Sequence, residues 1–410
     1  MSRAVPSKVF RTPSLWHLHV ASAAIKSGAF SAAADACGLT PSAVSQAVAS
    51  LERRYCCSLM ARPPGATPTP AGRLLEARAD RAVEFIVLGL RDAAGLSPGR
   101  AMQVIRLVSV RRLEALAMLV RLGGFGHAAR ALGIARPTVH RAVRDLEAAI
   151  GIRLFEATSY GVTPTRRAES LARQSSLAFA ELRQLDAELK AVRGEAGGSL
   201  VVAAMPLARA HLAPTAAELF ARSNPGCRIT ILEGAYDDLL SALRRGEADM
   251  IVGALRENLQ LSDVTQERLF VDKLSIVMRI GHPLAGKRSI SRNDLGKFPW
   301  VAPRRDSPLR AIYESLFKGA HPPADIIECN SLSAARSILL QSDRLTLLSR
   351  AQIFFEAEAG LLTAKPAAGA TMSRDIGLST RTHWMPTSPQ KEFLDLIRGL
   401  ARDLYAKSGA

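Results

Sequence analysis

The stretch Phe30-Ser-Ala-Ala-Ala-Asp-Ala-Cys-Gly-Leu-Thr-Pro-Ser-Ala-Val-Ser-Gln-Ala-Val-Ala-Ser-Leu-Glu52 decides how this chain folds. It predicts an alanine-rich helix, a turn at Gly38 and a second helix after Thr40, because threonine is a good N-cap and Pro41 suits the first helical position. The second helix has one apolar stripe, made of Val44, Val48, Leu51 and Tyr55. Two helices joined by a glycine turn, with a polar outer face, are typical of a helix-turn-helix that reads DNA.

The same pattern occurs a second time. From residue 125 the chain reads Phe125-Gly-His-Ala-Ala-Arg-Ala-Leu-Gly-Ile-Ala-Arg-Pro-Thr-Val-His-Arg-Ala-Val-Arg-Asp-Leu-Glu147. Phe30 matches Phe125, and Glu52 matches Glu147, at a constant offset of 95 residues. Such an internal repeat predicts two copies of one supersecondary unit.

The charge of the chain is concentrated in the part that holds the repeat. A length of 410 residues predicts two to three domains. The net charge is +17, and residues 1–194 carry 27 lysines and arginines against 14 aspartates and glutamates, whereas residues 195–410 carry 27 against 23. This asymmetry favours binding of a polyanion by the N-terminal part, and a generally arginine-rich proteome would not produce it.

Cysteine usage and hydropathy indicate a cytoplasmic protein. The five cysteines are odd in number and have no metal-ligand spacing, which favours free thiols in a reducing compartment and predicts no metal site. Basic residues precede a moderately apolar N-terminal stretch, but Trp16-His17-Leu18-His19 interrupts it, so we interpret the stretch as the first helix of the repeat rather than a secretory signal. No apolar run approaches the roughly 20 residues that span a bilayer.

Each predicted helix-turn-helix has the same neighbours. A support helix over residues 14–26 precedes the first, and a two-stranded wing over 59–72, a long helix over 73–94 and a break at 96–99 follow it. The second has a support helix from about Leu113 to Val120, a wing over 154–164 that we expect to be one residue shorter, and a long helix over 166–192. The apolar face of that last helix predicts a partner helix, and self-association is the natural candidate.

From Ser199 onward strands alternate with helices. Strands are predicted at residues 200–204, 228–232 and 250–253, with helices at 213–222 and 236–245 between them. Further strands at 274–278 and 345–348 and helices at 309–317, 333–341 and 390–405 continue the pattern. This alternation predicts a parallel α/β sheet.

With these residues in hand, the chain resembles the LysR-type transcriptional regulators. The first copy carries the signature in Gly28-Ala-Phe30, Thr40-Pro-Ser-Ala-Val-Ser-Gln46, Leu51-Glu52, Arg62 and Thr69-Pro-Ala-Gly72. The second copy carries it in Gly124-Phe125, Ala128-Ala129, Arg136-Pro-Thr-Val-His-Arg141, Leu146-Glu147, Gly151-Ile-Arg-Leu-Phe155 and Thr163-Pro164. In the C-terminal half, Gly246-Glu-Ala-Asp-Met-Ile-Val-Gly253 and Gly281-His-Pro-Leu284 look like landmarks of the family.

The resemblance implies a multidomain fold. It consists of two mainly α-helical winged helix-turn-helix domains with long linker helices, followed by an α/β periplasmic-binding-protein-like (type 2) effector domain of two subdomains. The corresponding ranges are 1–70 for the first winged helix-turn-helix, 71–108 for a linker helix and break, 109–165 for the second winged helix-turn-helix, 166–197 for a linker or dimerisation helix and 198–410 for the effector domain. Family members typically carry one helix-turn-helix, so the second is a departure.

Other departures concern the wings. Met60 stands where the family usually has phenylalanine, Glu156-Ala157 replaces the usual basic wing residue, and Thr165 replaces the small alanine after Thr-Pro. It therefore stays open whether either copy has lost base reading and kept only packing or phosphate contact.

The candidate DNA-binding residues face outward in the helical register. They are Thr40, Ser42, Ser45, Gln46, Arg53 and Arg62 in the first copy, and Arg136, Thr138, His140, Arg141 and Arg144 in the second. Pro137, His140, Arg141 and Arg144 are expected to correspond to the outward residues of the first copy. Gln46 suits an adenine edge and Arg141 a guanine edge. The alternative for each is a solvated helix face.

The candidate effector-binding residues lie at predicted strand ends, where α/β sheets bind ligands and helix N-termini favour anions. They are Met205, Pro206, Arg209, Gly234, Gly253, Pro303, Asn330 and Ser331. The family binds small metabolites there, so the resemblance makes Arg209 and Ser331 candidates for holding a carboxylate, sugar or phosphate. Met205 replaces the family's serine or threonine, and ordinary turns are the alternative interpretation.

We therefore expect a transcriptional regulator that binds double-stranded DNA and a small-molecule effector as a homodimer or homotetramer, with no cofactor and no membrane contact. His17 and His19 have no third ligand, and no nucleophile triad, phosphate loop or zinc motif occurs, which argues against an enzyme. The alternative is a ligand-responsive protein-interaction regulator in which one or both helix-turn-helix units are degenerate. DNA binding that weakens steeply with salt and depends on Gln46 or Arg141 would separate the two.

Overall fold

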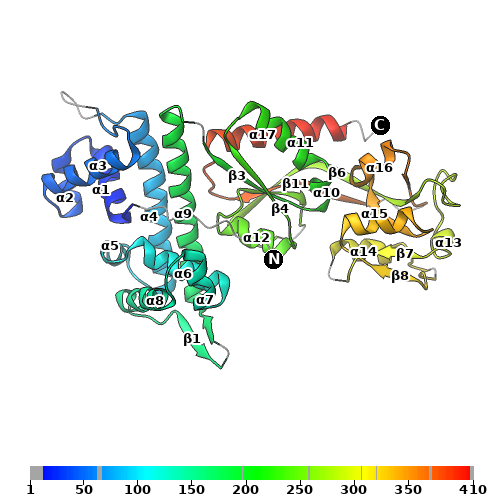
Figure 1. Ribbon diagram of the computed structural model, residues 1–410, viewed down its shortest axis with the longest axis horizontal. Coiled ribbons are helices and arrows are strands. Elements are labelled where there is room, and N and C mark those ends of the chain that lie inside the picture. The colour runs from blue at the N-terminus through cyan, green and yellow to red at the C-terminus, as the bar shows by residue number, and fades with distance from the viewer. Residues whose placement is uncertain are drawn as a thin grey trace. The chain divides into compact units, whose positions relative to one another are not determined.

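The computed structural model describes residues 13–61, 67–159, 161–195, 197–256, 259–305, 307–319, 321–368 and 372–406. The chain divides into two compact units (Figure 1). The helical unit comprises Met1–Ser199 with Gly226–Arg228 and Arg244–Glu247, and the sheet unit comprises Leu200–Pro225, Ile229–Leu243 and Ala248–Ala410.

The helical unit repeats one succession of three helices. The first copy contains α1 (Leu15–Ser27), α2 (Phe30–Cys37) and α3 (Pro41–Tyr55), and the second contains α6 (Val110–Leu122), α7 (Phe125–Leu132), α8 (Arg136–Ile150) and the hairpin of β1 (Phe155–Thr158) and β2 (Gly161–Pro164). The helices of the two copies begin 95 residues apart, as the repeat predicts. A long helix follows each copy: α4 (Pro70–Ala94) after the first and α9 (Arg166–Val192) after the second.

A further helix, α5 (Pro98–Leu107), lies where the sequence predicts only a break. The Ser97 hydroxyl accepts a hydrogen bond from the Arg100 N–H at 3.3 Å, and Pro98 occupies the first helical position. Ser-Pro-Gly therefore ends α4 and at once begins α5, because proline at that position lacks only an N–H that would have no helical partner. We expected a break at residues 96–99 and assigned no helix to residues 100–107, so our prediction missed α5.

The apolar stripe of α9 packs against α4 of the same chain. Leu171, Leu182, Leu185 and Leu189 of α9 share one continuous core with Leu75, Ile86 and Leu90 of α4. That core also includes residues of α1, α3, α5, α6 and α8. We expected a second chain to cover this apolar stripe, but a helix of the same chain covers it.

The second wing is one residue longer than the first, and not shorter as we expected. The N–H of Thr69 donates to the Leu59 carbonyl at 3.1 Å, and the N–H of Thr165 donates to the Leu154 carbonyl at 2.9 Å. Each threonine then caps the long helix that follows it, which makes Thr165 the counterpart of Thr69, 96 residues later. Thr165 therefore has the same capping role as Thr69, and it does not take the place of the alanine that usually follows Thr-Pro in the family.

The sheet unit has a mixed sheet with helices around it (Figure 1). Its strands are β3 (Ser199–Ala204), β4 (Arg228–Leu232), β5 (Met250–Ala254), β6 (Val264–Arg279), β7 (Trp300–Ala302), β8 (Ile326–Glu328), β9 (Leu345–Ser349), β10 (Leu362–Lys365) and β11 (Ser373–Arg381). Its helices are α10 (Pro206–Ala210), α11 (Leu212–Ser223), α12 (Tyr236–Arg244), α13 (Arg292–Leu295), α14 (Pro308–Ser315), α15 (Leu332–Leu340), the 3-10 turn η1 (Arg350–Ile353), α16 (Phe354–Glu358) and α17 (Ser388–Ala406).

The strand order is β4-β3-β5-β11-β6-β9-β7-β8, and β10 also pairs with β6. β3 pairs with β5 in parallel, but β6 and β11 run antiparallel to their neighbours, so the expected all-parallel sheet is wrong. The long strand β6 pairs with β11 along its first part and with β9 and β10 along its second. Each half of the sheet has its own core, one around Leu243 and Ile251 and one around Trp300 and Tyr313.

No helix in the described ranges combines the length and the apolar character that a bilayer crossing requires.

Candidate DNA-binding surfaces and effector site

The first candidate surface is the outer face of α3. Gly38 adopts a left-handed conformation (φ 62°) that lets the chain turn sharply between α2 and α3. The Thr40 hydroxyl accepts a hydrogen bond from the Ala43 N–H at 3.2 Å and so caps α3. The helix buries Val44, Ala47, Val48, Leu51 and Tyr55. This register leaves Ser42, Ser45, Gln46 and Arg53 exposed, as the sequence predicts.

The cap gives a direct test of how α3 is held. We expect Thr40→Ala to cost about 1 kcal/mol, since one N-terminal N–H of the helix loses its acceptor. Amide hydrogen exchange across α3 should then be about fivefold faster, because sub-global opening follows the local free energy. Ser42→Ala, at an exposed position of the same turn, is the matched control and should leave exchange unchanged. Equal exchange rates in the two variants would contradict the capping role.

The glutamate of each repeated Leu-Glu pair has a structural role that sequence reasoning did not assign. The Glu52 carboxylate accepts a hydrogen bond from the Leu59 N–H at 2.8 Å, and the Glu147 carboxylate accepts one from the Leu154 N–H at 2.7 Å. Both bonds tie the base of a wing to the end of the preceding helix. The identical offset of the two pairs was the only signal of this role in the sequence.

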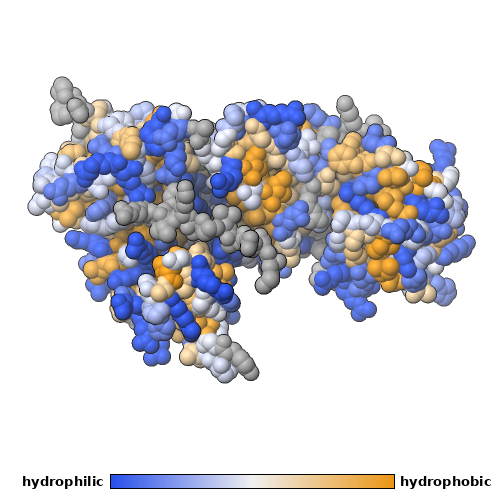
Figure 2. Space-filling model, viewed as in Figure 1, coloured by the Kyte–Doolittle hydropathy of each residue, from blue (hydrophilic) through white to orange (hydrophobic). Residues whose placement is uncertain are grey.

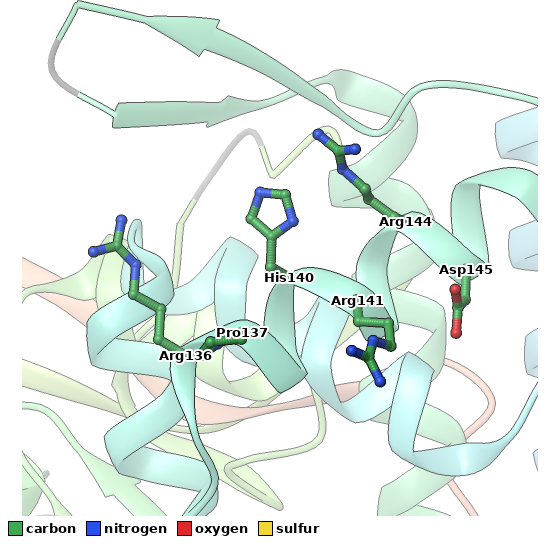
Figure 3. A pocket seen from close by; sticks show the side chains of 6 residues that line it. All are labelled: Arg136, Pro137, His140, Arg141, Arg144 and Asp145. Carbon is green, nitrogen blue, oxygen red and sulfur yellow. The ribbon is translucent and has the colours of Figure 1, made fainter.

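The second candidate surface is the outer face of α8, where three arginines and a histidine stand within nine residues. Arg136, Thr138, His140, Arg141 and Arg144 are all exposed. Arg136, Pro137, His140, Arg141, Arg144 and Asp145 line an open hollow on the helix (Figure 3). In this view His140 and Arg144 point toward the β1–β2 hairpin, while Arg141 points to the opposite side. Figure 2 shows mainly hydrophilic residues over this region of the helical unit.

Two contacts constrain α8. The His140 ring lies 4.8 Å from the Phe125 ring, centroid to centroid, so α7 holds it in place. Asp145 forms an ion pair with Arg112 of α6 at 3.2 Å. Arg141, like Arg136 and Arg144, is exposed and forms no ion pair with another described residue. The first copy has Ser45 in place of His140, so no second ring stacks on Phe30 from that position.

The correspondence of the two outer faces is only partial. Pro137, His140 and Arg141 stand 95 residues after Ser42, Ser45 and Gln46, as expected. Arg144, however, corresponds to Ala49, whereas Arg53 corresponds to Ala148. The basic residue therefore lies one helical turn earlier in α8 than in α3, and our pairing of Arg144 with Arg53 is wrong.

The wings differ in their described parts. Glu156 and Ala157 lie in β1, and both are exposed. The base of the first wing has a single bridge between Met60 and Pro68, with both strands too short to form a sheet within the described residues. Arg62, the predicted phosphate or minor-groove contact, lies outside the described residues.

Part of the candidate effector site lies at the ends of β3, β4 and β5. The Met205 N–H donates to the Val252 carbonyl at 2.9 Å, and a Cβ at Gly253 would lie 2.4 Å from the Met205 Cβ. Gly253 therefore lets the Met205 side chain pack directly on β5. Pro206 begins the short helix α10, which also contains Arg209, and the Arg209 side chain lies outside the described part. Gly234 is exposed after β4.

The remaining candidates belong to the other half of the sheet. Pro303 is buried after β7, and its carbonyl accepts a hydrogen bond from Arg310 at 3.1 Å. The Asn330 side chain accepts a hydrogen bond from the Arg304 N–H at 3.2 Å, and the Ser331 hydroxyl caps α15 by accepting from Ala334 at 3.3 Å. These contacts bring Asn330 to the segment after β7. They also show that Asn330 and Ser331 already stabilise local structure.

A buried ion pair lies where β6, β11 and η1 meet, and sequence reasoning did not single it out. Arg374 donates to Asp272 at 3.0 Å and to the Gln352 side chain at 3.0 Å. Burial raises the pKa of the Asp272 carboxyl, and the charge of Arg374 only partly offsets this. Neither residue lies in a strand that the sequence predicts, so no sequence pattern signalled this ion pair. The contacts of Arg374 connect β11 to β6 through Asp272 and to η1 through Gln352. β6 itself pairs with strands of both halves of the sheet.

Comparison with known proteins follows the same division of the chain. The family model described as "LysR substrate binding domain" matches residues 193–402, and the model described as "Bacterial regulatory helix-turn-helix protein, lysR family" matches residues 15–73 and 110–169. The second match falls on both copies of the three-helix succession.

Among curated proteins, the HTH-type transcriptional regulator GalR of Pseudomonas putida is 31% identical over 374 residues, which cover 90% of this chain and 93% of that protein. The HTH-type transcriptional regulator PcaQ of Agrobacterium fabrum is 26% identical over 300 residues, covering 73% of this chain and 96% of its own length. The alignment with GalR thus extends over most of both proteins, whereas PcaQ leaves about a quarter of this chain unmatched.

Solved structures show the same fold. A full-length OxyR variant from Pseudomonas aeruginosa matches with a TM-score of 0.53 at 21% identity, covering 72% of this chain and 94% of its own. CbnR, a LysR family transcriptional regulator, matches with a TM-score of 0.50 at 18% identity, covering 72% and 99%. The family models and the alignment with GalR show that the chain belongs to the LysR family of bacterial transcriptional regulators, with a DNA-binding helix-turn-helix and an effector-binding domain.

Proposed function

We propose that both copies are winged helix-turn-helix domains that bind double-stranded DNA, and that each inserts the outer face of its third helix into a major groove. Gln46 of α3 would contact an adenine edge and Arg141 of α8 a guanine edge, because these side chains form bidentate hydrogen bonds with those bases. The observation that carries the proposal is the exposed hydrogen-bonding face of both α3 and α8 on the same three-helix frame. Thr40, Thr138 and Arg136 lie at the start of these helices, where helix N-termini contact phosphates.

The rival function is a regulator that acts through protein contacts with one or both copies degenerate. Glu156 in the second wing and the uncapped start of α8 at Ala135 favour it for that copy. Against it stands the cationic face of α8, since three exposed arginines on one helix suit a polyanion better than a general protein surface. The charge excess of residues 1–194 agrees with DNA binding by this unit.

For the sheet unit we propose that a small-molecule effector binds between the two halves, at the strand ends that carry Met205, Gly253, Pro303 and Asn330. Support comes from their position at carboxyl ends of strands, where α/β sheets bind ligands. Such a ligand changes DNA binding only if it binds one arrangement of the protein more tightly than another. The domain ranges set out above, 1–70, 71–108, 109–165, 166–197 and 198–410, belong to the same proposal.

The decisive experiment is selection of bound duplexes from a random pool by full-length protein. Wild type, a Ser45→Ala/Gln46→Ala double variant and Arg141→Ala are compared, all changed only at exposed positions. We expect wild type to select a motif of two parts, and each variant to lose preference in one part while still binding with a steep salt dependence. Unchanged motifs in all three would overturn the assignment of these residues. Binding without any sequence preference would favour the degenerate-copy rival.

A further inference from the structure

The helices α4 and α9 form an antiparallel pair within one chain. Arg78, near the start of α4, contacts Glu181 and Glu188 in the last half of α9, whereas Gly89, near the end of α4, lies against Leu171 and Gln174 in the first half of α9. The residue numbers thus rise along one helix as they fall along the other. Figure 1 shows the two helices side by side.

The pair is closely packed and contains a buried cluster of charged side chains around Arg78. A Cβ at Gly89 would lie 2.9 Å from the Gln174 Cβ, so the two backbones approach closely there. The Arg78 side chain is fully buried and donates to Glu181 at 2.7 Å and to both carboxylate oxygens of Glu188 at 2.9 Å. Burial opposes the charged form of Arg78, but the hydrogen bonds that it donates to Glu188 and Glu181, together with their negative charge, outweigh burial and raise the pKa of the guanidinium. A buried, bidentate contact of this kind fixes the register of the two helices.

Because the pair is antiparallel, the two copies lie at its opposite ends. The first copy leads into the N-terminus of α4 at Thr69, and the second leads into the N-terminus of α9 at Thr165. α4 has 25 residues and is therefore about 37 Å long at 1.5 Å per residue. Half-sites read by paired helix-turn-helix units lie one turn of DNA, about 34–36 Å, apart.

Three contacts hold the copies to this frame. The Arg106 guanidinium of α5 lies over the Trp16 ring of α1, 4.7 Å from its centroid. α5 also packs against α8, so it contacts both copies. At the far end of α9, Arg193 donates to the backbone carbonyl of Tyr55, the last residue of α3. α9 thus extends from one copy to the other.

We infer that a single chain of this protein occupies a two-part DNA site by itself, placing α3 and α8 on two half-sites about one helical turn apart. The antiparallel pair relates the copies by an approximate two-fold axis, so the half-sites are inverted, as they are for a dimer. Their sequences differ, since Gln46 and Ser45 stand where the other copy has Arg141 and His140. The inference rests on the proposed DNA binding by both copies. A homodimer or homotetramer of this chain would use surfaces other than the apolar faces of α4 and α9.

Complementation between chains tests whether the two copies act in cis. The Ser45→Ala/Gln46→Ala chain and the Arg141→Ala chain are co-expressed with different tags, and doubly tagged oligomers, if any form, are isolated with both purified parents as controls. Affinity is measured for the duplex that wild type selects. Each parent should bind it roughly 5- to 150-fold more weakly than wild type, the loss expected for one good base contact.

If the copies act in cis, the mixed sample binds no better than its parents, because every chain lacks one contact of its pair. Recovery of affinity toward the wild-type value would overturn the inference, since an intact α3 of one chain would then work with an intact α8 of another. This outcome is distinct from failure of the proposed function, in which neither parent loses affinity. As a check independent of these side chains, the mass of the complex at protein concentrations below any self-association should correspond to one chain per duplex. A minimum of two chains per duplex would also overturn the inference.

Discussion

Replacement of Arg78 by alanine is expected to destabilise the helical unit by about 3–5 kcal/mol, the usual cost of removing one partner of a buried ion pair. Arg78 is fully buried between α4 and α9, and its loss leaves Glu181, itself only 6% exposed, with fewer compensating charges. Arg81 still contacts Glu181 at 3.0 Å, but the Glu188 carboxylate loses both of its hydrogen bonds to Arg78. The effect should therefore approach that range rather than the small cost of a surface pair.

Urea unfolding followed by a probe of the helical unit, or hydrogen exchange of α4 and α9, measures the change. Lys26→Ala provides the control, because it removes an ion pair to Asp80 in which both side chains are substantially exposed. Such a pair contributes no more than about 1 kcal/mol. If the two variants lost stability equally, the buried cluster would not be what holds the helix pair in register.

Gly72→Ala is expected to destabilise the first copy by about 1–3 kcal/mol, the range for overpacking a close contact. A Cβ at this position would lie 2.1 Å from the Leu59 carbonyl oxygen, a backbone atom that cannot turn aside. That carbonyl also accepts the N–H of Thr69, which caps α4. The methyl group must therefore move the start of α4 away from the base of the wing.

Hydrogen exchange of residues 67–75 and of α3 reports the loss, and Gly99→Ala is the matched control. Gly99 lies in the first turn of α5 with open space where a Cβ would be, so alanine there should be neutral or stabilise the helix by up to about 1 kcal/mol. The second copy has Ala168 at the position equivalent to Gly72, so it already accommodates the methyl group. Equal protection in both glycine variants would show that the wing base tolerates movement.

Local patterns predicted most helices because each pattern contains its own boundaries. Thr40 with Pro41 and the left-handed Gly38 define α3 and the preceding turn, and the apolar stripes correctly place the outward residues of α3 and α8. Where a local signal was ambiguous the prediction was wrong. Pro98-Gly99 was interpreted as a break although Ser97 makes it a helix start.

Features that depend on distant contacts were not accessible from the sequence. Nothing in α9 alone indicates that α4 covers its apolar face, since an internal partner and a second chain would select the same stripe. The first part of β6 has a run of polar and charged residues, Thr265 to Arg268, in place of an alternating apolar pattern, and this part pairs with β11 as a strand. The effector candidates were chosen by position at strand ends. The Asn330 side chain, however, accepts a hydrogen bond from the N–H of Arg304, which is distant in the sequence, and the Ser331 hydroxyl caps α15, a role for which serine is common.

The two outer faces lie on separate stretches of one polypeptide, and this has a consequence for how the protein changes over time. In a symmetric dimer of identical chains, every substitution in the reading helix appears at both positions at once. Here a substitution in α3 leaves α8 unchanged. The two helices already differ at equivalent positions, since α3 has Gln46 and Ala49 where α8 has Arg141 and Arg144. Under the proposed DNA binding by both copies, each face can therefore acquire its own base preference by single steps, without the simultaneous loss of the other.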